Sequence, residues 1–482
     1  MEEKKIGLKS DVLGLLGAAT LGVVFLSPAM TLYGLFGPTF LSSGSAAPLA
    51  FVFALIATLP TASSYALLSR DYPSSGSAAD WATRAIGDKV GIWTGWVVFL
   101  YYFTNFIIQP VALGLFFGDL LSALEMTSNM AHVFGFFLGV VVCLAWPAWL
   151  VYRGISVSTK SALAFLLFET IIVLALCGTI LVLAPHRGTP LNLTGFSFKG
   201  SVGGVPGLFS AMIFAMLGFC GFDVVSTVAE ETKMAKKLIP QATILCLVVF
   251  ASFIIVGVWA LTFGGNASHL REVAESGRMP ITDIAASFWG RGSVLVTLTG
   301  ISATFGLAIV TAVGASRILF SMGRNGHTSK VFSELHPTYR VPWKSLHVIF
   351  AGGLIGSLIA YFSMGAYNSY VWWATTSTFF AMVTYLFVNF AVLVLFRKKI
   401  FQSFGGFFLY GAIPVFGIVA DIYLVIESFF IELWNGNWAT GKSIVIFDTV
   451  CAITALVLTF RVKKSVPLVS QELYVPMDKI QT

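Results

Sequence analysis

The chain has 482 residues, of which 57% are hydrophobic and only 11% are charged, and its mean hydropathy is +0.87. Soluble domains have about 45–50% apolar residues with glycine counted, so this composition excludes a dispersed soluble protein and predicts a membrane protein with many spans. The net charge of +7 does not indicate a nucleic-acid partner, because most basic residues lie in short loops between apolar runs.

Apolar runs long enough to cross a bilayer, about 20 residues each, recur along the whole chain. The start, MEEKKIGLKSD, mixes acidic and basic residues and has no small-residue cleavage site, so we expect the first run to be a membrane span and not a signal peptide. The sequence predicts twelve spans, at residues 11–36, 46–69, 90–122, 132–152, 160–184, 205–228, 240–264, 291–322, 345–363, 369–396, 407–432 and 445–462.

The basic residues are distributed unevenly between the two sides of these spans. The side that holds both termini would carry 23 of the 29 Lys and Arg residues. Since positive charge collects in cytoplasmic segments, we expect both termini to be cytoplasmic and the chain to be a multi-pass protein of the cell membrane. The opposite side would carry only Arg187, Lys199, Arg271, Arg278, Arg291 and Lys442.

Two of the predicted spans, 1 and 6, are expected to be broken helices. In span 1 the stretch GVVFLSPAMTLYG places Pro28 inside an apolar run, where proline removes one backbone donor and clashes with the preceding turn. In span 6 the stretch FAMLGFCGFDVVSTVAEE combines Gly218 and Gly221 with Asp223. A broken helix survives in a bilayer only where it is buried in protein or lines a cavity. Both breaks therefore mark a candidate site, although ordinary proline kinks and glycine packing would give the same residues.

The two breaks are five spans apart. Five is an odd number, so a second copy of a five-span unit would start on the opposite side of the membrane. This spacing predicts an inverted repeat with a break in the first helix of each copy. Matched interrupted helices of this kind are the best sequence indicator of the binding site of a secondary transporter.

Three segments carry a resemblance to a known family. The first, YPSSGSAADWATRAIGDKVGIWTGW, has Tyr-Pro, a small-residue turn, an aromatic residue and then Gly-x-x-x-Gly-Trp at the start of span 3. The second, GFDVVSTVAEETKMAKKLIPQA, has Gly-Phe-Asp, Ala-Glu-Glu-Thr and a basic stretch that closes with Ile-Pro-x-Ala. The third, SRILFSMGRNGHTSKVFSELHPTYRVPWKSL, has Arg-x-x-x-x-Met-x-Arg-x-Gly after span 8. In these motifs and their order, the whole chain resembles the amino acid–polyamine–organocation (APC) family of secondary transporters.

The resemblance implies a fold and a division of the chain. It implies an all-α membrane protein of 12 transmembrane helices, with a five-plus-five inverted-repeat (LeuT-like) core, discontinuous helices 1 and 6, and two extra helices. The parts would be a cytoplasmic tail at 1–10, a first repeat at 11–204, a second repeat at 205–396, two additional helices at 397–462 and a cytoplasmic tail at 463–482.

Two positions depart from the family pattern. The Asn-Pro that usually follows the acidic pair is replaced by Lys233-Met234, and the Gly-Ser-Gly run that many members carry in span 1 reads Leu21-Gly22-Val23. The stretch FLSPAMTLYG is more similar to the branch that holds amine and polyamine permeases. An amine or polyamine substrate therefore stays open beside an amino acid.

The predicted substrate site is built largely from backbone at the two breaks. Amide donors at the start of the outer half of span 1 suit a carboxylate, and carbonyls freed in spans 1 and 6 suit an ammonium group. The candidates at the breaks are Gly22, Val23, Val24, Phe25, Ser27, Gly218 and Gly221. The side-chain candidates on spans 3, 6 and 8 are Tyr101, Asn105, Leu217, Cys220 and Ser302.

Four acidic residues have predicted roles in coupling and gating. An acid at the position of Asp223 senses protons in some family members, so the resemblance implies a coupling role, and a helix cap is the alternative. Glu169 in span 5 is a second candidate for proton or ammonium binding, because an intramembrane acid is costly to ionise. Glu230 and Glu231 are expected to form an inner gate with basic residues, or else to be solvated interfacial charge.

The sequence thus predicts a permease that moves an amino acid by proton symport or by exchange, with a proton rather than sodium as the coupling ion. A polyamine or amine permease of the same fold and a transporter-like nutrient sensor are the alternatives. An enzyme is not expected, because no nucleophile–base pair or phosphate loop stands out. No cofactor or metal is expected, since the cysteines lie in apolar runs without ligand spacing: Cys143, Cys177, Cys220, Cys246 and Cys451.

Overall fold

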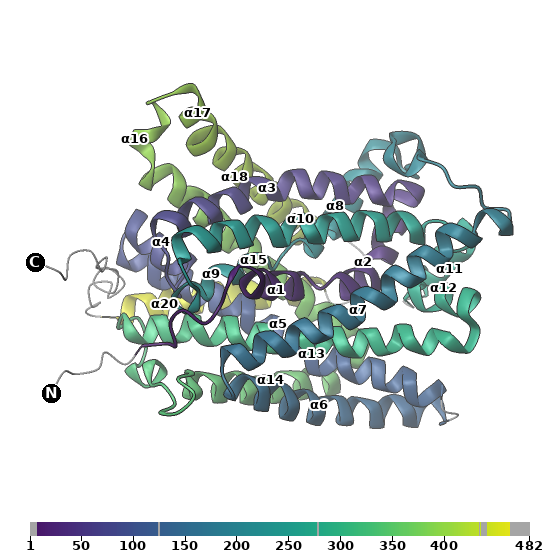
Figure 1. Ribbon diagram of the computed structural model, residues 1–482, viewed down its shortest axis with the longest axis horizontal. Coiled ribbons are helices and arrows are strands. Elements are labelled where there is room, and N and C mark those ends of the chain that lie inside the picture. The colour runs from purple at the N-terminus through teal and green to yellow at the C-terminus, as the bar shows by residue number, and fades with distance from the viewer. Residues whose placement is uncertain (1–6, 124–125, 277–278, 433, 435–440, 463–482) are drawn as a thin grey trace, which may run out of the picture.

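The computed structural model describes residues 7–123, 126–276, 279–432, 434 and 441–462, and it is built of helices. Long helices lie side by side along the longest axis of the molecule (Figure 1). Within the described residues the only strand-like pairing is a single bridge between Leu13 and Thr232. Arg278 and most of the two predicted tails lie outside the described residues. The expectation of an all-α protein is confirmed.

The helices follow one another with short connections. In the first half they are α1 (Leu15–Leu26), α2 (Pro28–Ser43), α3 (Ala47–Asp71), α4 (Ala78–Ala85), α5 (Asp88–Ala123), α6 (Ser128–Tyr152), α7 (Ile155–Leu183), α8 (Gly204–Gly218), α9 (Val224–Thr227) and α10 (Ala235–Leu261). In the second half they are α11 (Ala267–Glu275), α12 (Pro280–Trp289), α13 (Val294–Arg324), α14 (Trp343–Met364), α15 (Ala366–Leu395), α16 (Arg397–Ile400), α17 (Phe404–Phe407), α18 (Ile413–Leu424) and α20 (Gly441–Arg461). Two π-helical segments, Phe408–Ala412 and Val425–Glu432, flank α18.

Ten helical stretches of the described chain are long and apolar enough to cross a membrane. Most predicted spans match a helix to within a few residues, as 345–363 matches α14 and 445–462 matches α20. One stretch, Leu15–Asp71, contains predicted spans 1 and 2, and predicted span 6 corresponds to the shorter α8. The short helices α4, α11 and α12 were not predicted, because they are amphipathic and lie in loops between the apolar runs.

The bundle has two distinct ends. At one end, which we call the terminal end, the chain enters α1 and leaves α20 (left in Figure 1). There Lys89, at the start of α5, donates hydrogen bonds from Nζ to the carbonyl oxygens of Thr459 and Val462. The opposite end, which we call the far end, carries α11 and α12 (right in Figure 1).

The first helix break lies at Ser27, between α1 and α2. Ser27 has a φ of 45°, a left-handed conformation that residues other than glycine rarely adopt. Pro28 is the first residue of α2, where its missing N–H costs nothing because that donor would be unpaired in any helix. The predicted proline break is therefore present. It follows Leu26, so Gly22, Val23 and Val24 lie inside continuous helix.

The second break separates α8 from α9. The α8 helix ends at Gly218, and the chain turns through residues 219–223 before the single turn of α9 begins at Val224. Gly221 has a φ of 136°, which favours glycine. The break predicted around Gly218 and Gly221 is present at those residues.

The two breaks contact each other in the centre of the bundle. A Cβ atom added to Gly221 would lie 2.6 Å from Cδ1 and 3.0 Å from the carbonyl carbon of Phe25, so this approach requires glycine. A Cβ added to Gly218 would likewise meet Thr31 Cγ2 at 2.8 Å. The unwound backbone of both helices is thereby buried in protein, as irregular backbone in a membrane must be.

Close glycine contacts also set the packing of α5 against α6. Gly114 and Gly118 on α5 face Gly139 and Gly135 on α6, where an added Cβ on either α6 glycine would lie 2.4 Å from an α5 backbone nitrogen. Small residues four apart allow helix backbones to approach closely, which is the main source of packing energy between helices in lipid. This pairing fixes α5, which carries the site residues described below.

Candidate functional site

A cavity of about 120 Å³ lies at the level of the two helix breaks. Seven of the predicted substrate residues line it: Phe25, Ser27, Tyr101, Asn105, Leu217, Gly218 and Cys220. The rest of its lining comes from α1, α2, α5, α13 and α15, with Leu26, Met30, Thr31, Leu35, Ile108, Gln109, Leu307, Tyr370, Ala374, Ser377 and Thr378. The structure thus brings residues from both breaks and from α5 to one hollow.

The other predicted substrate residues lie outside this lining. Gly22 packs against Cys246 and Val225, where an added Cβ would lie 2.6 Å and 2.8 Å from their side chains. Val23 and Val24 are buried within α1. Gly221 contacts Phe25 and donates its N–H to Tyr385 Oη at 3.3 Å. On α13, Ser302 Oγ donates a 3.2 Å hydrogen bond to the carbonyl of Phe165 on α7.

A second hollow, of about 450 Å³, continues from the cavity toward the far end. The two hollows share four lining residues, which are Leu35, Leu217, Tyr370 and Ala374. Residues of α2, α11 and α12 complete the second hollow, including Tyr33, Ala274 and Pro280. Since α11 and α12 lie at the far end (Figure 1), this hollow connects the cavity with that side of the molecule.

The polar side chains that line the cavity are uncharged. Among its described lining residues there is no Asp, Glu, Lys, Arg or His. The first amide groups of α2 have no partner within their own helix. At the carbonyl ends of α1 and α8, Leu26 O accepts from Thr31 Oγ1 at 3.0 Å and Leu217 O accepts from Cys220 N at 3.2 Å, and each carbonyl oxygen keeps a second lone pair. Ser27 Oγ is buried and has no hydrogen-bond partner among the described residues. Such a site can bind a positive and a negative group through helix ends without a charged side chain.

Asp223 lies next to the cavity but behind Tyr101. Its Oδ1 accepts hydrogen bonds from Tyr385 Oη at 2.7 Å and from Tyr101 Oη at 3.3 Å, and Tyr102 Oη donates to Oδ2. All four side chains are buried. Burial opposes ionisation of this carboxyl and three hydroxyl donors favour the carboxylate form, so its protonation depends on the positions of these tyrosines. Asp223 makes no side-chain cap to the helix that follows it.

Glu169 lies apart from this cluster, on α7. It is 2% exposed, and its Oε2 has no hydrogen-bond partner among the described residues. Ser302 contacts α7 one turn before it, at Phe165. The two predicted candidates Glu169 and Ser302 therefore share the interface of α7 and α13, which neither hollow includes.

Two ion pairs join the segment after α9 to α13 near the terminal end, one buried and one partly buried. Glu231 receives two hydrogen bonds from Arg317 on α13, at 3.0 Å and 3.1 Å, and both side chains are almost fully buried. Glu230 receives two from Arg324, at 2.8 Å and 2.7 Å, and two more from the N–H and Oγ of Ser75. The predicted gate acids are thus paired with arginines of α13 and are not solvated.

Further contacts lie near the same end. Asp80 on α4 accepts a 3.0 Å hydrogen bond from Asn325 Nδ2 and another from Ser74 Oγ. The backbone N–H groups of Val12 and Leu13 both donate to the carbonyl of Glu231. The segment before α1 is therefore tied to the segment that follows α9.

The pKa values of two carboxyl groups near the terminal end, Glu230 and Asp80, are shifted in opposite directions. Burial alone would raise the pKa of Glu230, but the hydrogen bonds and charge of Arg324 and the Ser75 donors outweigh it, so the pKa lies below its ordinary value. Burial raises the pKa of Asp80, which the Ser74 hydrogen bond and the charge of Arg324 only partly oppose. The Glu230–Arg324 ion pair thus persists into acidic solution.

Several residues of the site were not predicted. Tyr385 on α15, Asp80, and Gln109 on α5 carry contacts that depend on the three-dimensional arrangement. Gln109 could have been found from the sequence, because it follows Asn105 by four residues in an otherwise apolar run and so shares its helix face. Tyr385 has no such signal.

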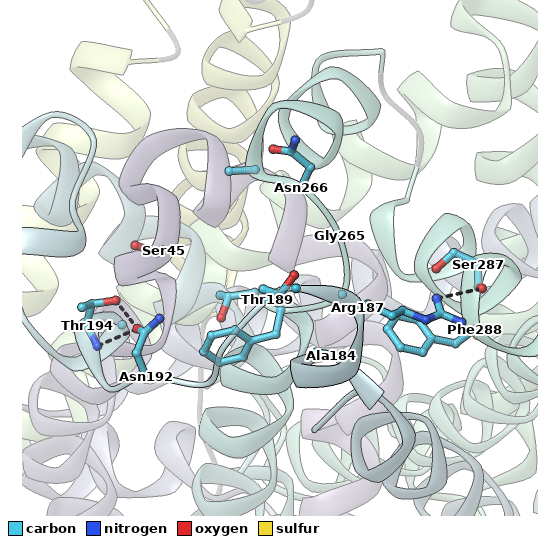
Figure 2. A pocket seen from close by; sticks show the side chains of 16 residues that line it. Ser45, Ala184, Arg187, Thr189, Asn192, Thr194, Gly265, Asn266, Ser287 and Phe288 are labelled. Atoms are coloured by element: carbon cyan, nitrogen blue, oxygen red, sulfur yellow. Dashed lines mark hydrogen bonds between the residues drawn. The ribbon is translucent and has the colours of Figure 1, made fainter. Parts of the chain in front are cut away.

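A hollow larger than these two lies elsewhere. It is a crevice of about 740 Å³ among the loops at the far end (Figure 2). Arg187, the only charged residue among its described lining residues, donates to the carbonyl of Ser287 at 3.1 Å and lies 4.1 Å from the centre of the Phe288 ring. Arg187 and Asn192 bond to other residues of this lining, and none of the lining residues belongs to either helix break, so its size does not make it the substrate site.

The described residues contain no group of three or more His, Cys, Asp or Glu side chains placed to hold a metal ion. All five cysteines are free thiols.

A family model described as amino acid permease matches residues 26–469. The low-affinity putrescine importer PlaP of Escherichia coli is 26% identical over 435 residues, which cover 89% of this chain and 90% of the importer. The branched-chain amino acid permease BcaP of Bacillus subtilis is 27% identical over 350 residues, covering 68% of this chain and 70% of that permease.

Among solved structures, a mutant of the manganese transporter of Eremococcus coleocola has the same overall fold. The two superpose with a TM-score of 0.56 and 11% sequence identity, covering 95% of this chain and 97% of that one. This likeness concerns the fold alone.

Proposed function

Because the chain belongs to the amino acid permease family, we propose that it carries an amino acid across the cell membrane by alternating access. As a member of this family it is a multi-pass membrane transporter and not an enzyme. The observation that carries the substrate proposal is that two helix breaks, five predicted spans apart, meet at one uncharged cavity.

The architecture we propose is twelve spans with a five-plus-five inverted-repeat core. Ten long apolar stretches support it, since Leu15–Asp71 is long enough for two spans and α8 with the turn after it supplies one more. In this arrangement α1 with α2 begins the first repeat, and α8 with α9 begins the second. The two helices after residue 396 lie outside the core.

The amino acid would bind with its charged groups at the helix breaks. The start of α2 offers unpaired amide donors and a positive dipole end to the carboxylate, and Ser27 Oγ is available as a further donor. The carbonyl ends of α1 and α8 offer acceptors and a negative dipole end to the ammonium group. A zwitterion is then neutralised by backbone, which agrees with the absence of charge among the described lining residues.

The ion pairs near the terminal end and the hollow toward the far end support alternating access. With both termini cytoplasmic, as the distribution of basic residues favours, the structure corresponds to a state closed to the cytoplasm and accessible from outside. The Glu230–Arg324 and Glu231–Arg317 pairs would then be the inner gate, which must separate before the substrate can leave toward the terminal end. Leu217 and Tyr370 lie between the two hollows and would form the outer constriction.

Proton coupling through Asp223 is part of the proposal. Tyr101 both lines the cavity and donates to Asp223, so a bound substrate that shifts Tyr101 changes the hydrogen bonds of the carboxyl. Protonation of Asp223 would in turn release the tyrosines that hold α5 and α15 to the second break. Glu169 is a second candidate for the coupled proton, because it is buried and its Oε2 is unpaired within the described chain.

Transport of a polyamine or another amine is the second candidate function. It is favoured by the likeness to the putrescine importer over 89% of this chain. Against it stands the composition of the cavity, since two ammonium groups would meet no carboxylate among the described lining residues. Asp223, the nearest predicted acid, is covered by tyrosine hydroxyls.

The test is a thermal-shift screen of the purified protein against amino acids and polyamines at two pH values, followed by uptake in proteoliposomes. We expect amino acids to stabilise the protein and an inward proton gradient to drive their uptake. Stabilisation by diamines alone would refute the amino acid proposal. Uptake that ignores the pH gradient in the wild type and in Asp223→Asn alike would refute proton coupling through Asp223.

A further inference from the structure

The side chain of Gln109 occupies an unusual position in the cavity wall. It is 2% exposed and lines the cavity on α5, yet its Oε1 has no hydrogen-bond partner among the described residues. Its Nε2 donates to the backbone carbonyl of Asn105 at 2.8 Å and to Asn105 Oδ1 at 3.1 Å. The amide nitrogen is therefore hydrogen-bonded, and the amide oxygen has no partner among the described residues.

The orientation of this amide follows from its neighbours. Asn105 Nδ2 donates to Ser377 Oγ, and Ser377 Oγ donates to the carbonyl of Tyr101, so the donors and acceptors run in one direction along the network. Turning the Gln109 amide over would place its oxygen against two other acceptors, Asn105 O and Asn105 Oδ1. The unpaired group of this cavity-lining side chain is therefore an acceptor.

An unpaired buried acceptor is costly, at about 1–3 kcal/mol. A ligand that brings a hydrogen-bond donor to Gln109 Oε1 removes this cost, and a ligand of the same shape without a donor does not. Binding sites of this kind discriminate strongly between such ligands, because the site pays the cost whenever the donor is absent.

The position of Gln109 along α5 indicates which part of the ligand it meets. It lies eight residues after Tyr101, which packs against Phe25 at the first break, but its amide reaches back to Asn105, only four residues or about 6 Å along the helix from Tyr101. The charged ends of an amino acid held at the breaks therefore lie toward Tyr101. The side chain of that amino acid points along α5 toward Gln109.

The charge of the cavity restricts the donor further. A second ammonium group at Gln109 would have no acidic partner among the described lining residues, and a charge left unpaired in this setting is unfavourable. A neutral donor has no such cost. Hydroxyl and carboxamide groups are the strong neutral donors that small amino acid side chains carry, and a cavity of about 120 Å³ disfavours the larger ring donors of Trp and His.

We propose that Gln109 is a specificity-determining residue whose Oε1 accepts a hydrogen bond from a neutral donor on the substrate side chain, so that small amino acids with a hydroxyl or carboxamide group are preferred. This inference rests on the proposed amino acid transport and names its substrate class. It separates the chain from the substrates in the names of the two relatives above, since putrescine has two charged ends and branched-chain amino acids have no side-chain donor.

The test measures uptake of serine, threonine, asparagine and glutamine against alanine, valine and putrescine in proteoliposomes. We expect the wild type to prefer the donor-bearing amino acids by about tenfold in kcat/KM, which corresponds to about 1.4 kcal/mol. In Gln109→Leu, which has a similar volume and no acceptor, the preference should fall to about unity through a higher KM for the donor-bearing group. Gln241→Leu, the same change at an exposed position on α10, should keep the wild-type ratio.

The outcomes separate this inference from the proposed function. Thermal unfolding of purified Gln109→Leu shows whether the variant is folded, and Gln109→Met serves as a second variant without the acceptor. If the wild type transports alanine or valine as well as serine, or if both variants keep the wild-type ratio, the inference is wrong while amino acid transport stands. If the wild type transports putrescine and no amino acid, the proposed function and this inference both fail.

Discussion

The hydroxyl of Tyr385 on α15 donates a 2.7 Å hydrogen bond to Oδ1 of Asp223, in the turn between α8 and α9. The same hydroxyl oxygen accepts the N–H of Gly221 at 3.3 Å. A helix of the second half of the chain is thereby fastened to both the acid and the backbone of the second break. Because Tyr101 on α5 shares the same carboxylate oxygen, Asp223 holds α5 and α15 together beside the cavity.

Replacing Tyr385 by phenylalanine tests the role of this contact. The variant loses one of three donors to the carboxylate, and a hydrogen bond to a charged group contributes about 1.5–3 kcal/mol. The pH at which uptake is half-maximal should therefore rise by about one to two units. The measurement is uptake in proteoliposomes over a range of pH, with Tyr361→Phe as the control, since Tyr361 on α14 stacks on Phe136 away from the site. An unmoved profile in Tyr385→Phe would show that Asp223 is not the coupled acid.

The buried pair of Glu231 and Arg317 predicts an asymmetric effect on stability. Arg317→Ala leaves a carboxylate buried without its counter-charge, which should cost about 3–5 kcal/mol. The double variant Glu231→Met with Arg317→Met removes both charges and should recover most of that loss. Thermal unfolding of the purified protein measures both. A double variant as unstable as Arg317→Ala would mean that the pair acts through packing and not through charge.

The pair of Glu230 and Arg324 predicts a pH-dependent contribution to stability. The folded protein holds the pKa of Glu230 below its ordinary value of 4.5, because Arg324 outweighs the effect of burial. This contribution is present above 4.5 and is lost as the pH falls through the lowered pKa. The difference in melting temperature between the wild type and Glu230→Gln should therefore be constant near neutral pH and should shrink below 4.5. A difference that grows on acidification would contradict the assignment.

The contact between the two breaks predicts that alanine is not tolerated at Gly221. Its positive φ disfavours any side chain, and a Cβ there would lie 2.6 Å from Phe25. Gly221→Ala should lower the melting temperature and abolish uptake. Gly178→Ala on α7 is the matched control, because nothing lies within 4 Å of an added Cβ and alanine favours helix by about 1 kcal/mol. Equal behaviour of the two variants would refute the proposed contact.

The helices and the two breaks follow from features that act locally. Runs of about 20 apolar residues must be helical in a bilayer, and Pro28 marks the first break locally. Proline alone does not fix a break, since Pro38, Pro60 and Pro110 lie inside α2, α3 and α5. Such signals need only neighbouring residues, which is why the positions of α14 and α20 could be predicted. The first break was predicted to begin at Gly22, but α1 continues to Leu26. The turn before Pro28 stays helical because it is tightly packed, with Gly22 against Cys246.

The contacts of the site could be predicted only in part. Tyr101, Asn105 and Leu217 line the cavity as expected, since their helices were identified. Tyr385 is one of several aromatic residues in an apolar span and lies 162 residues from Asp223, so no local pattern connects them. Ser302 was predicted to supply a hydroxyl group from span 8 to the site. The face of α13 that carries it packs against α7 instead. Side-chain direction around a helix axis depends on packing that one sequence does not reveal.

The central claim is that the substrate binds in the cavity where the two breaks meet. The most direct measurement is a structure of the protein at saturating concentration of the amino acid that stabilises it most in the thermal-shift screen. The account predicts ligand density between Ser27 and Gly218, with a side-chain donor at hydrogen-bond distance from Gln109 Oε1. Density in the loop crevice beside Arg187 with the central cavity empty would contradict it.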